Sequence, residues 1–338
     1  MNGKEGLGLV PLSEMARRLG ITRERVRQLV HEGRLRGVRL GRYWYVVEEG
    51  GFRLGLAFTL FTHAGGAGKT SLARDLGYEL ALRGFKVLLV DVDPQANLTS
   101  WLGVRDVDQG ETLLSLLDTG HLPEPRYLEK LDLYLIPSSL DLARMEVRLA
   151  QRPLSTLLLR SALKRRREYD FVLIDSLPSL GHLAAMAALA GHGLLVPVET
   201  GLKGLEALVG VMEVAKEYRQ ALGQVETDLP DPFIRLFIPT KFDPRTSGDQ
   251  KVLDRIMALR EIAPVASPLA YRPGPHRRAT EAGMPIHFGR DKQAREEIER
   301  LAEEFLAMAQ GMGVVDDSLG YGQEASPEGA RVDGGRTR

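Results

Sequence analysis

The sequence predicts an α/β protein, in which a parallel sheet carries helices on both faces and a small basic domain precedes it. From about residue 55 to residue 309, short apolar segments of strand type alternate with longer segments of helical period. Alternation of this kind places crossover helices on both faces of a parallel sheet. The first fifty residues differ in composition, because positions 11–47 contain nine arginines against three glutamates.

The composition limits the kinds of site that the protein can carry. The 338 residues include 45 Lys and Arg and 45 Asp and Glu, so the net charge does not indicate a polyanionic partner. The chain has no cysteine, which excludes disulfides, thiolate zinc sites and iron–sulfur ligation. Its start lacks the apolar core of a signal peptide, and no apolar run reaches membrane-spanning length. We therefore expect a cytoplasmic protein.

These features divide the chain into three parts. Residues 1–50 form the basic domain, residues 51–310 form the α/β domain, and residues 311–338 form a tail. The tail is rich in Gly, Ser, Asp and Glu and has no periodicity, so we expect it to be disordered.

The basic domain has the pattern of a helix-turn-helix. Apolar residues at helical spacing line a first helix that ends near Gly20, and Thr22 caps a second helix with its own apolar face. Four polar side chains then point outward from the second helix, where they can reach bases or phosphates in a major groove. They are Arg23, Arg25, Arg27 and Gln28.

The next segment, GRLRGVRLGRYWYV, resembles the short wing of MerR-like and excisionase-type winged helices. This resemblance makes Arg39 and Arg42 the expected phosphate contacts. We expect Trp44 to pack in the small core rather than to stack on a base. The local positive charge favours DNA as the ligand, and the alternative is a winged helix that binds protein.

The segment after the first apolar strand predicts a phosphate-binding loop. Glycines let backbone amides surround phosphate oxygens, a helix N-terminus adds partial positive charge, a lysine adds a cation, and a threonine hydroxyl can ligate Mg²⁺. His63 stands where the strict G-x-x-x-x-G-K-[ST] pattern has glycine, so the loop is a variant. The predicted nucleotide-binding residues are Gly65, Gly66, Ala67, Gly68, Lys69, Thr70 and Ser71.

Carboxylates end two later strands. Asp91 and Asp93 point to the same side of the chain, because alternate strand residues share a face. Both can share the metal and phosphate environment, and one of them can orient the attacking water. The alternative for either residue is to cap the helix that follows. Asp175 ends the apolar strand DFVLID and is expected to hold Mg²⁺ directly or through water.

At this point residues 55–309 resemble the ParA/MinD family of deviant-Walker ATPases, and the ParA branch in particular. HAGGAGKTS stands where the family has K-G-G-x-G-K-T, VLLVDVDPQANLT resembles its second motif, and YDFVLIDSLPSLGHL resembles its third. The resemblance implies a P-loop NTPase fold and a homodimer that encloses ATP and Mg²⁺. It places Lys69 on the phosphates, Thr70 and Asp175 at the metal, and Asp93 beside the attacking water.

One position departs from the family. Its first lysine in K-G-G-x-G-K-T reaches the nucleotide of the partner subunit, and Ala64 stands there in this chain. A cation at a transferring phosphoryl group can contribute several kcal/mol. Another cation must replace it, or hydrolysis is slow, or the dimer uses other contacts. His63 and Lys203 are two candidate replacements that the sequence does not rank.

The predicted function is ATP-dependent DNA partitioning by a nucleoid-associated ATPase. The resemblance implies a ParB-like centromere-binding partner, nonspecific DNA binding by the ATP dimer and, with the N-terminal domain, repression of its own operon. Two alternatives remain: a nucleotide-sensing transcription regulator with little ATP turnover, and an ATPase that positions a protein cargo. The tail has no amphipathic helix, so no membrane partner is expected. Candidate nonspecific DNA contacts are Lys241, Arg245, Arg272, Arg277, Arg278 and Arg290.

Overall fold

The computed structural model describes residues 9–19, 22–31, 35, 37–40, 43–47, 55–166, 168–226 and 233–313. The predicted turn at Gly20, the contact Arg42 and the part of the predicted tail beyond residue 313 lie outside these residues. The last helix reaches Gly313, so it extends past the predicted boundary at residue 310. Within the described part, no helix has the length and apolar character needed to cross a membrane.

The N-terminal part contains two short helices and a three-stranded antiparallel sheet in the order β1-β3-β2. Its elements are β1 (Leu9–Pro11), α1 (Leu12–Leu19), α2 (Arg23–His31), β2 (Gly37–Leu40) and β3 (Tyr43–Val47). A small core joins them, with Val26 fully buried at its centre. Trp44 packs against this core and meets the ring of His31 edge to face at 5.6 Å, which confirms its predicted place. The winged helix-turn-helix assignment stays a prediction.

The large domain is built on a seven-stranded sheet in the order β10-β9-β4-β8-β5-β7-β6. Its strands are β4 (Leu56–Leu60), β5 (Val87–Asp91), β6 (Arg126–Leu128), β7 (Leu133–Ile136), β8 (Phe171–Asp175), β9 (Leu194–Glu199) and β10 (Ile234–Thr240). All neighbours are parallel except β6, which pairs antiparallel with β7. Only four residues separate these two strands, and a connection that short permits only an antiparallel pair.

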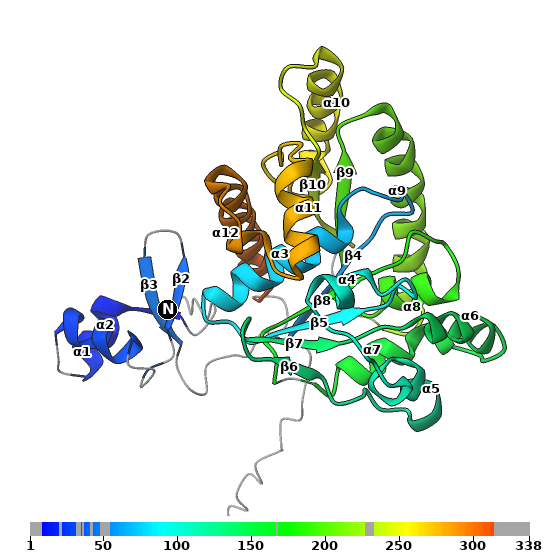
Figure 1. Ribbon diagram of the computed structural model, residues 1–338, viewed down its shortest axis with the longest axis horizontal. Coiled ribbons are helices and arrows are strands. Elements are labelled where there is room, and N and C mark those ends of the chain that lie inside the picture. The colour runs from blue at the N-terminus through cyan, green and yellow to red at the C-terminus, as the bar shows by residue number, and fades with distance from the viewer. Residues whose placement is uncertain are drawn as a thin grey trace, which may run out of the picture.

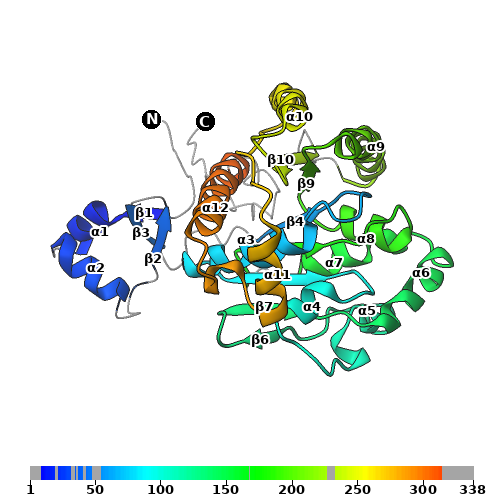
Figure 2. The same cartoon turned by 45° about the horizontal axis from the view of Figure 1, so that its top comes forward.

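Helices cover both faces of the sheet, as the sequence predicted (Figures 1 and 2). One face carries α3 (Lys69–Leu82), α11 (Pro273–Ala282) and α12 (Lys292–Gly313). The other face carries α5 (Leu114–Thr119), α6 (Ala143–Ala150), α7 (Leu158–Leu163), α8 (His182–Leu189), α9 (Leu202–Leu222) and α10 (Ser247–Met257). The short α4 (Asn97–Trp101) follows the end of β5. The carboxyl ends of the central strands therefore open between the two helical layers.

Strand periodicity explains why both layers pack well. In β8, Phe171 and Leu173 enter the core under α3 and α12, whereas Val172 and Ile174 enter the core on the opposite face. All of them are at most 2% exposed. A strand that alternates between two apolar faces must lie in the middle of a covered sheet, because successive side chains point to opposite sides.

Phe305 packs the last helix, α12, against the sheet. Truncation of its side chain should therefore destabilise the domain. It is fully buried, and its ring lies 5.3 Å from that of Phe58 and 5.2 Å from that of Phe171. Phe305→Ala should lower the free energy of unfolding by about 3 to 5 kcal/mol, because it leaves a cavity among packed rings. Chemical denaturation measures this loss. An effect below about 1 kcal/mol would contradict the packing described for α12.

Candidate functional site

The phosphate loop spans residues 62–71 and joins β4 to α3. Gly66 and Gly68 adopt left-handed φ angles of 80° and 96°, a conformation that side chains with a Cβ atom rarely tolerate. Gly68 is also the N-cap residue of α3, so unpaired amides of the first helical turn are available at the loop. All seven predicted nucleotide-binding residues lie in this one turn and the start of α3, and their role stays a prediction.

The ammonium group of Lys69 lies inside the loop. Its Nζ donates to the backbone oxygen of Thr62 at 2.9 Å and to that of Ala64 at 3.2 Å. Burial lowers the pKa of Lys69, while the nearby carboxylates of Asp175 and Asp93 oppose this shift. The loop therefore holds a cation where phosphate oxygens would meet both it and the backbone amides.

Asp91 and Asp175 lie side by side at the carboxyl ends of β5 and β8, where they are paired in register. Both are fully buried, but their surroundings differ. The carboxylate of Asp91 accepts hydrogen bonds from the amide of Asp93 and from the amide and hydroxyl of Thr99, at 2.6 to 3.1 Å. It thereby connects α4 to the end of β5, but it is not the N-cap of that helix, because Ala96 occupies the N-cap position. Its role as a metal ligand stays a prediction.

Asp175 is held less firmly. Among the described residues, neither of its oxygens has a hydrogen bond of ordinary geometry, and the hydroxyl of Thr70 is close enough to stabilise the ionised carboxylate. Burial, and next the charge of Asp91, raise the pKa of Asp175 well above its usual value, and Thr70 and Lys69 oppose this rise. Burial likewise raises the pKa of Asp91 to about 7. A buried carboxylate without a donor is costly unless a ligand supplies a positive charge.

The side-chain oxygens of Thr70 and Asp175 suit Mg²⁺, which prefers oxygen ligands. Within the described ranges, no three or more His, Asp or Glu side chains converge as a metal site. Magnesium commonly needs only one or two protein oxygens, since water and nucleotide phosphates complete its shell. Thr70 and Asp175 would hold the ion, and it would supply positive charge to the phosphate oxygens.

Asp93 is buried just beyond the end of β5, close enough for its charge to act on Lys69. It is 9% exposed, and its Oδ1 accepts a hydrogen bond from the amide of Gln95 at 2.9 Å. Its backbone oxygen accepts from the hydroxyl of Ser138 at 2.7 Å, and the amide of Ser138 donates to Thr99. The ends of β5 and β7 are thus linked around Asp93, whose catalytic role stays a prediction.

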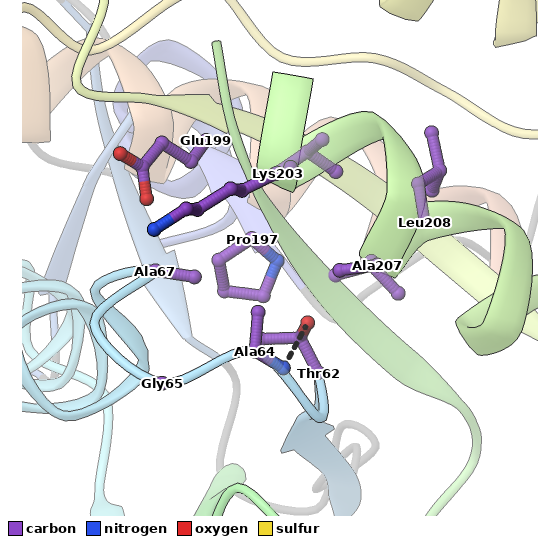
Figure 3. Close-up of a pocket in the computed structure, with 12 residues that line it drawn as sticks. Thr62, Ala64, Gly65, Ala67, Pro197, Glu199, Lys203, Ala207 and Leu208 are labelled. Atoms are coloured by element: carbon purple, nitrogen blue, oxygen red, sulfur yellow. Dashed lines mark hydrogen bonds between the residues drawn. The ribbon is translucent and has the colours of Figure 1, made fainter. Parts of the chain in front are cut away.

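Two cavities flank the phosphate loop. The first, which we call the α9 cavity, has a volume of about 240 Å³ and lies between the loop and the start of α9. Figure 3 shows the side chain of Lys203 extending from α9 across Pro197 toward Ala67, with Glu199 beside it. The walls are otherwise mostly apolar.

The second, the α11 cavity, has a volume of about 280 Å³ and lies between the loop and α11. Ser71 lines it from the first turn of α3, and Thr240 lines it from the end of β10. Gly66, Gly68 and Ser71 form part of its wall, so this cavity adjoins the predicted phosphate site. It is lined by backbone and side chains from five separate segments, which are residues 66–72, 240–241, 269–273, 276 and 294–298.

Comparison with known proteins agrees with this geometry. A family model described as an AAA domain matches residues 57–224. A Thermus thermophilus protein named "Probable plasmid-partitioning protein ParA" is 72% identical over 298 residues, which cover 88% of this chain and 92% of that relative. The chain belongs to the ParA/MinD family of P-loop ATPases. The family resemblance identified from the sequence is confirmed.

Solved structures of other ParA/MinD-type proteins share the fold. Cyanothece McdA in its apo form has a TM-score of 0.65 at 23% identity, over 74% of this chain and 99% of that one. Pyrococcus horikoshii MinD, a septum site-determining protein complexed with Mg-ADP, has a TM-score of 0.57 at 24% identity. That match covers 75% of this chain and 98% of MinD.

The structure distinguishes the two candidate replacements for the missing ParA lysine. The ring of His63 packs beneath α9, where a Cβ atom added to Gly210 would lie 2.7 Å from its Cε1. Lys203 instead lines the α9 cavity beside Ala64. Geometry therefore favours Lys203, because His63 is directed into the packing of the helix.

The predicted DNA contacts of the N-terminal domain are only partly described. Arg23, Arg27 and Gln28 are exposed on α2, and Arg25 is half-buried. Arg39 lies on β2, and its side chain, like all of Arg42, lies outside the described part. The exposed residues thus occupy one helix of this ParA-family chain, as the helix-turn-helix pattern anticipates.

The candidate DNA contacts of the ATPase domain have varied surroundings. Arg277, Arg278 and Arg290 are exposed. Arg245 is 88% exposed but pairs with Asp243 at 2.8 Å, and this pairing lowers the pKa of Asp243 to about 2. Arg272 is only 24% exposed, pairs with Glu297 at 3.1 Å and lines the α11 cavity, so it has a structural partner already.

Sequence reasoning missed two parts of the site. Lys241 counted as a candidate DNA contact, yet its Nζ lies 3.3 Å from Glu199 and faces the phosphate loop near Gly66. His276 lies in a basic segment that the sequence does not connect with the nucleotide site, yet it lines the α11 cavity. Both follow elements far along the chain from the loop, so no local motif joined them to it.

Proposed function

We propose that this chain is a DNA-partitioning ATPase, which binds ATP and Mg²⁺, forms a homodimer, binds DNA and releases it after hydrolysis. One observation carries the proposal: a buried lysine inside a phosphate loop lies near a buried carboxylate, Asp175, whose oxygens have no hydrogen bond of ordinary geometry among the described residues, at the end of the neighbouring strand. The very similar plasmid-partitioning ParA supports DNA as the cargo. ATP and Mg²⁺ are the cofactors consistent with this family.

In this proposal, the oxygen of a water molecule attacks the γ-phosphorus and the bond to the β,γ-bridging oxygen breaks, which gives ADP and phosphate. Lys69 and the loop amides hold the phosphate oxygens, and Thr70 and Asp175 hold Mg²⁺. Asp93 orients the water and can take up its proton. Hydrolysis should be slow without a ParB-like partner, because Ala64 stands where the family has the lysine that reaches the nucleotide of the partner subunit.

The decisive experiment is steady-state ATP hydrolysis with and without duplex DNA and the ParB-like protein. Turnover that rises with both ligands supports partitioning. The second candidate, a nucleotide-sensing regulator, is favoured specifically by Ala64, and predicts operator affinity that depends on ATP without turnover. A protein cargo in place of DNA would give turnover that responds to the cargo and not to duplex. Gel filtration with ATP and with ADP then tests the dimer.

Lys203 should contribute to turnover more than to binding. We propose that its ammonium stabilises charge on the transferring phosphoryl group, where the family lysine is missing. Lys203→Ala should reduce kcat about 10- to 100-fold and leave ATP affinity within about threefold. Lys203→Arg should restore part of the rate. Unchanged kcat in Lys203→Ala would show that this cation plays no part.

Specific DNA binding is proposed for the N-terminal domain. Replacing both Arg23 and Arg27 by alanine should weaken binding to the operator by about 1 to 3 kcal/mol for each base contact. Arg17→Ala is the matched control, since this side chain is 77% exposed on α1. Fluorescence anisotropy with operator and scrambled duplexes measures the change. Equal affinity of the double variant for every duplex would make the domain a protein-binding element.

A further inference from the structure

Several polar side chains line the α11 cavity, among them Ser71, Tyr271 and Arg272. The hydroxyl of Thr240 donates to the backbone oxygen of Ala67 at 3.0 Å, and Lys241 pairs with Glu199. Arg272 pairs with Glu297, whose other oxygen accepts from the amide of Ala270. His276 is the histidine of this lining, and within the described residues no hydrogen bond reaches its buried Nδ1.

The ring of His276 lies beside a buried charge cluster on α3. Its Nδ1 is buried and lies 3.8 Å from Oδ2 of Asp75. Asp75 is fully buried and accepts two hydrogen bonds from Arg74, at 2.8 and 3.0 Å, and one from the amide of Ile286 at 2.9 Å. A carboxylate fixed in this way favours a ring proton on the nitrogen that faces it.

The opposite edge of the ring then faces the cavity as an acceptor. The side chain is 37% exposed and lines the cavity wall. Burial lowers the pKa of His276, and although Asp75 opposes this shift, the net direction favours the neutral ring. A neutral imidazole that keeps its proton on Nδ1 presents a lone pair on Nε2.

We propose that His276 selects the base of the nucleotide, by accepting a hydrogen bond from the exocyclic amine of adenine. The inference rests on the proposed nucleotide site and extends it to one residue. Adenine presents a donor at position 6, whereas guanine and hypoxanthine present an acceptor there. An acceptor on the protein therefore favours ATP and opposes GTP and ITP.

The test compares ATP with ITP, which carries an oxygen in place of the amine at position 6. Calorimetry on the full chain with Mg²⁺ should show ATP binding about tenfold tighter than ITP. ATP gains a hydrogen bond to His276, whereas ITP would place its oxygen acceptor against the ring acceptor. His276→Ala should weaken ATP binding about tenfold and change ITP affinity less than about twofold. His276→Gln keeps an acceptor and should retain part of the preference.

Controls separate this inference from the nucleotide site itself. Glu281→Gln, on the same helix and 67% exposed, should keep the wild-type ratio of ATP to ITP affinity. A wild-type chain that binds neither nucleotide would refute the nucleotide site. Tight ATP binding without discrimination against ITP, or a ratio that His276→Ala and His276→Gln both leave unchanged, would refute only the role of His276.

Discussion

Lys69→Ala should abolish nucleotide binding under conditions where the wild-type chain is saturated. Lys69 is 6% exposed and its ammonium donates to two backbone oxygens of the loop, so it supplies a fixed positive charge there. Removing one partner of a buried charge pair costs about 2 to 5 kcal/mol, which is a loss of affinity of about 30-fold or more. Isothermal titration with ATP and Mg²⁺ measures this change.

The matched control for this variant is Lys292→Ala. That side chain is 80% exposed and pairs with Glu296 one turn along α12. Its removal should leave ATP affinity unchanged. If Lys69→Ala binds ATP as the wild type does, the phosphate-loop assignment is wrong, and the dimer and the partitioning cycle lose their basis.

Asp175→Asn should have opposite effects on stability and on function. Without nucleotide, the wild type carries a buried carboxylate that has no hydrogen bond of ordinary geometry among the described residues. Burial raises the pKa of Asp175 well above 3.8, so between these values the native state keeps a proton that the unfolded state has lost. Stability therefore falls as the pH rises through the raised pKa. The amide does not titrate, so the variant should be the more stable one at alkaline pH.

With nucleotide, the order should reverse. The neutral amide of the Asp175→Asn variant is a weaker ligand for a hard cation than a carboxylate, so Mg²⁺ should no longer tighten ATP binding or support hydrolysis. Denaturant titrations without nucleotide, at about pH 5.5 and about pH 8.5, measure the first effect, and ATP affinity with and without Mg²⁺ measures the second. Asp254→Asn, exposed on α10, is the control. A variant less stable than wild type at both pH values would contradict the account of Asp175.

The stretch from β4 to α3 was predictable because all of its chemistry is local. Two glycines, Lys69 and Thr70 lie close together in the chain, and Lys69 donates to loop oxygens only five and seven residues away. The pairing of Asp91 with Asp175 was also foreseeable in outline, since strand ends of a parallel sheet meet at one edge. That Asp91 is held by Thr99 while Asp175 is not depends on α4, which the sequence pattern alone did not position.

Other assignments needed the folded chain. Arg272 looks like a free surface cation in the sequence, but α12 brings Glu297 to it. Lys241 is likewise a basic residue that the sequence predicts as a DNA contact. Its position directly after β10 places it beside the phosphate loop. The antiparallel β6 likewise follows from a short connection rather than from the composition of the strand.

The sequence by itself determined the α/β class, the phosphate loop, the acidic strand ends and membership of the ParA/MinD family, because each depends on residues close together in the chain. Only the tertiary structure showed the surroundings of single side chains: Lys203 lines the α9 cavity whereas His63 packs beneath α9, Asp91 accepts hydrogen bonds from Thr99, and His276 lines the α11 cavity. Neighbours from distant segments of the chain pair with some charged side chains and form hydrogen bonds with their polar groups. A side chain's availability for chemistry is therefore a property of packing and not of local sequence.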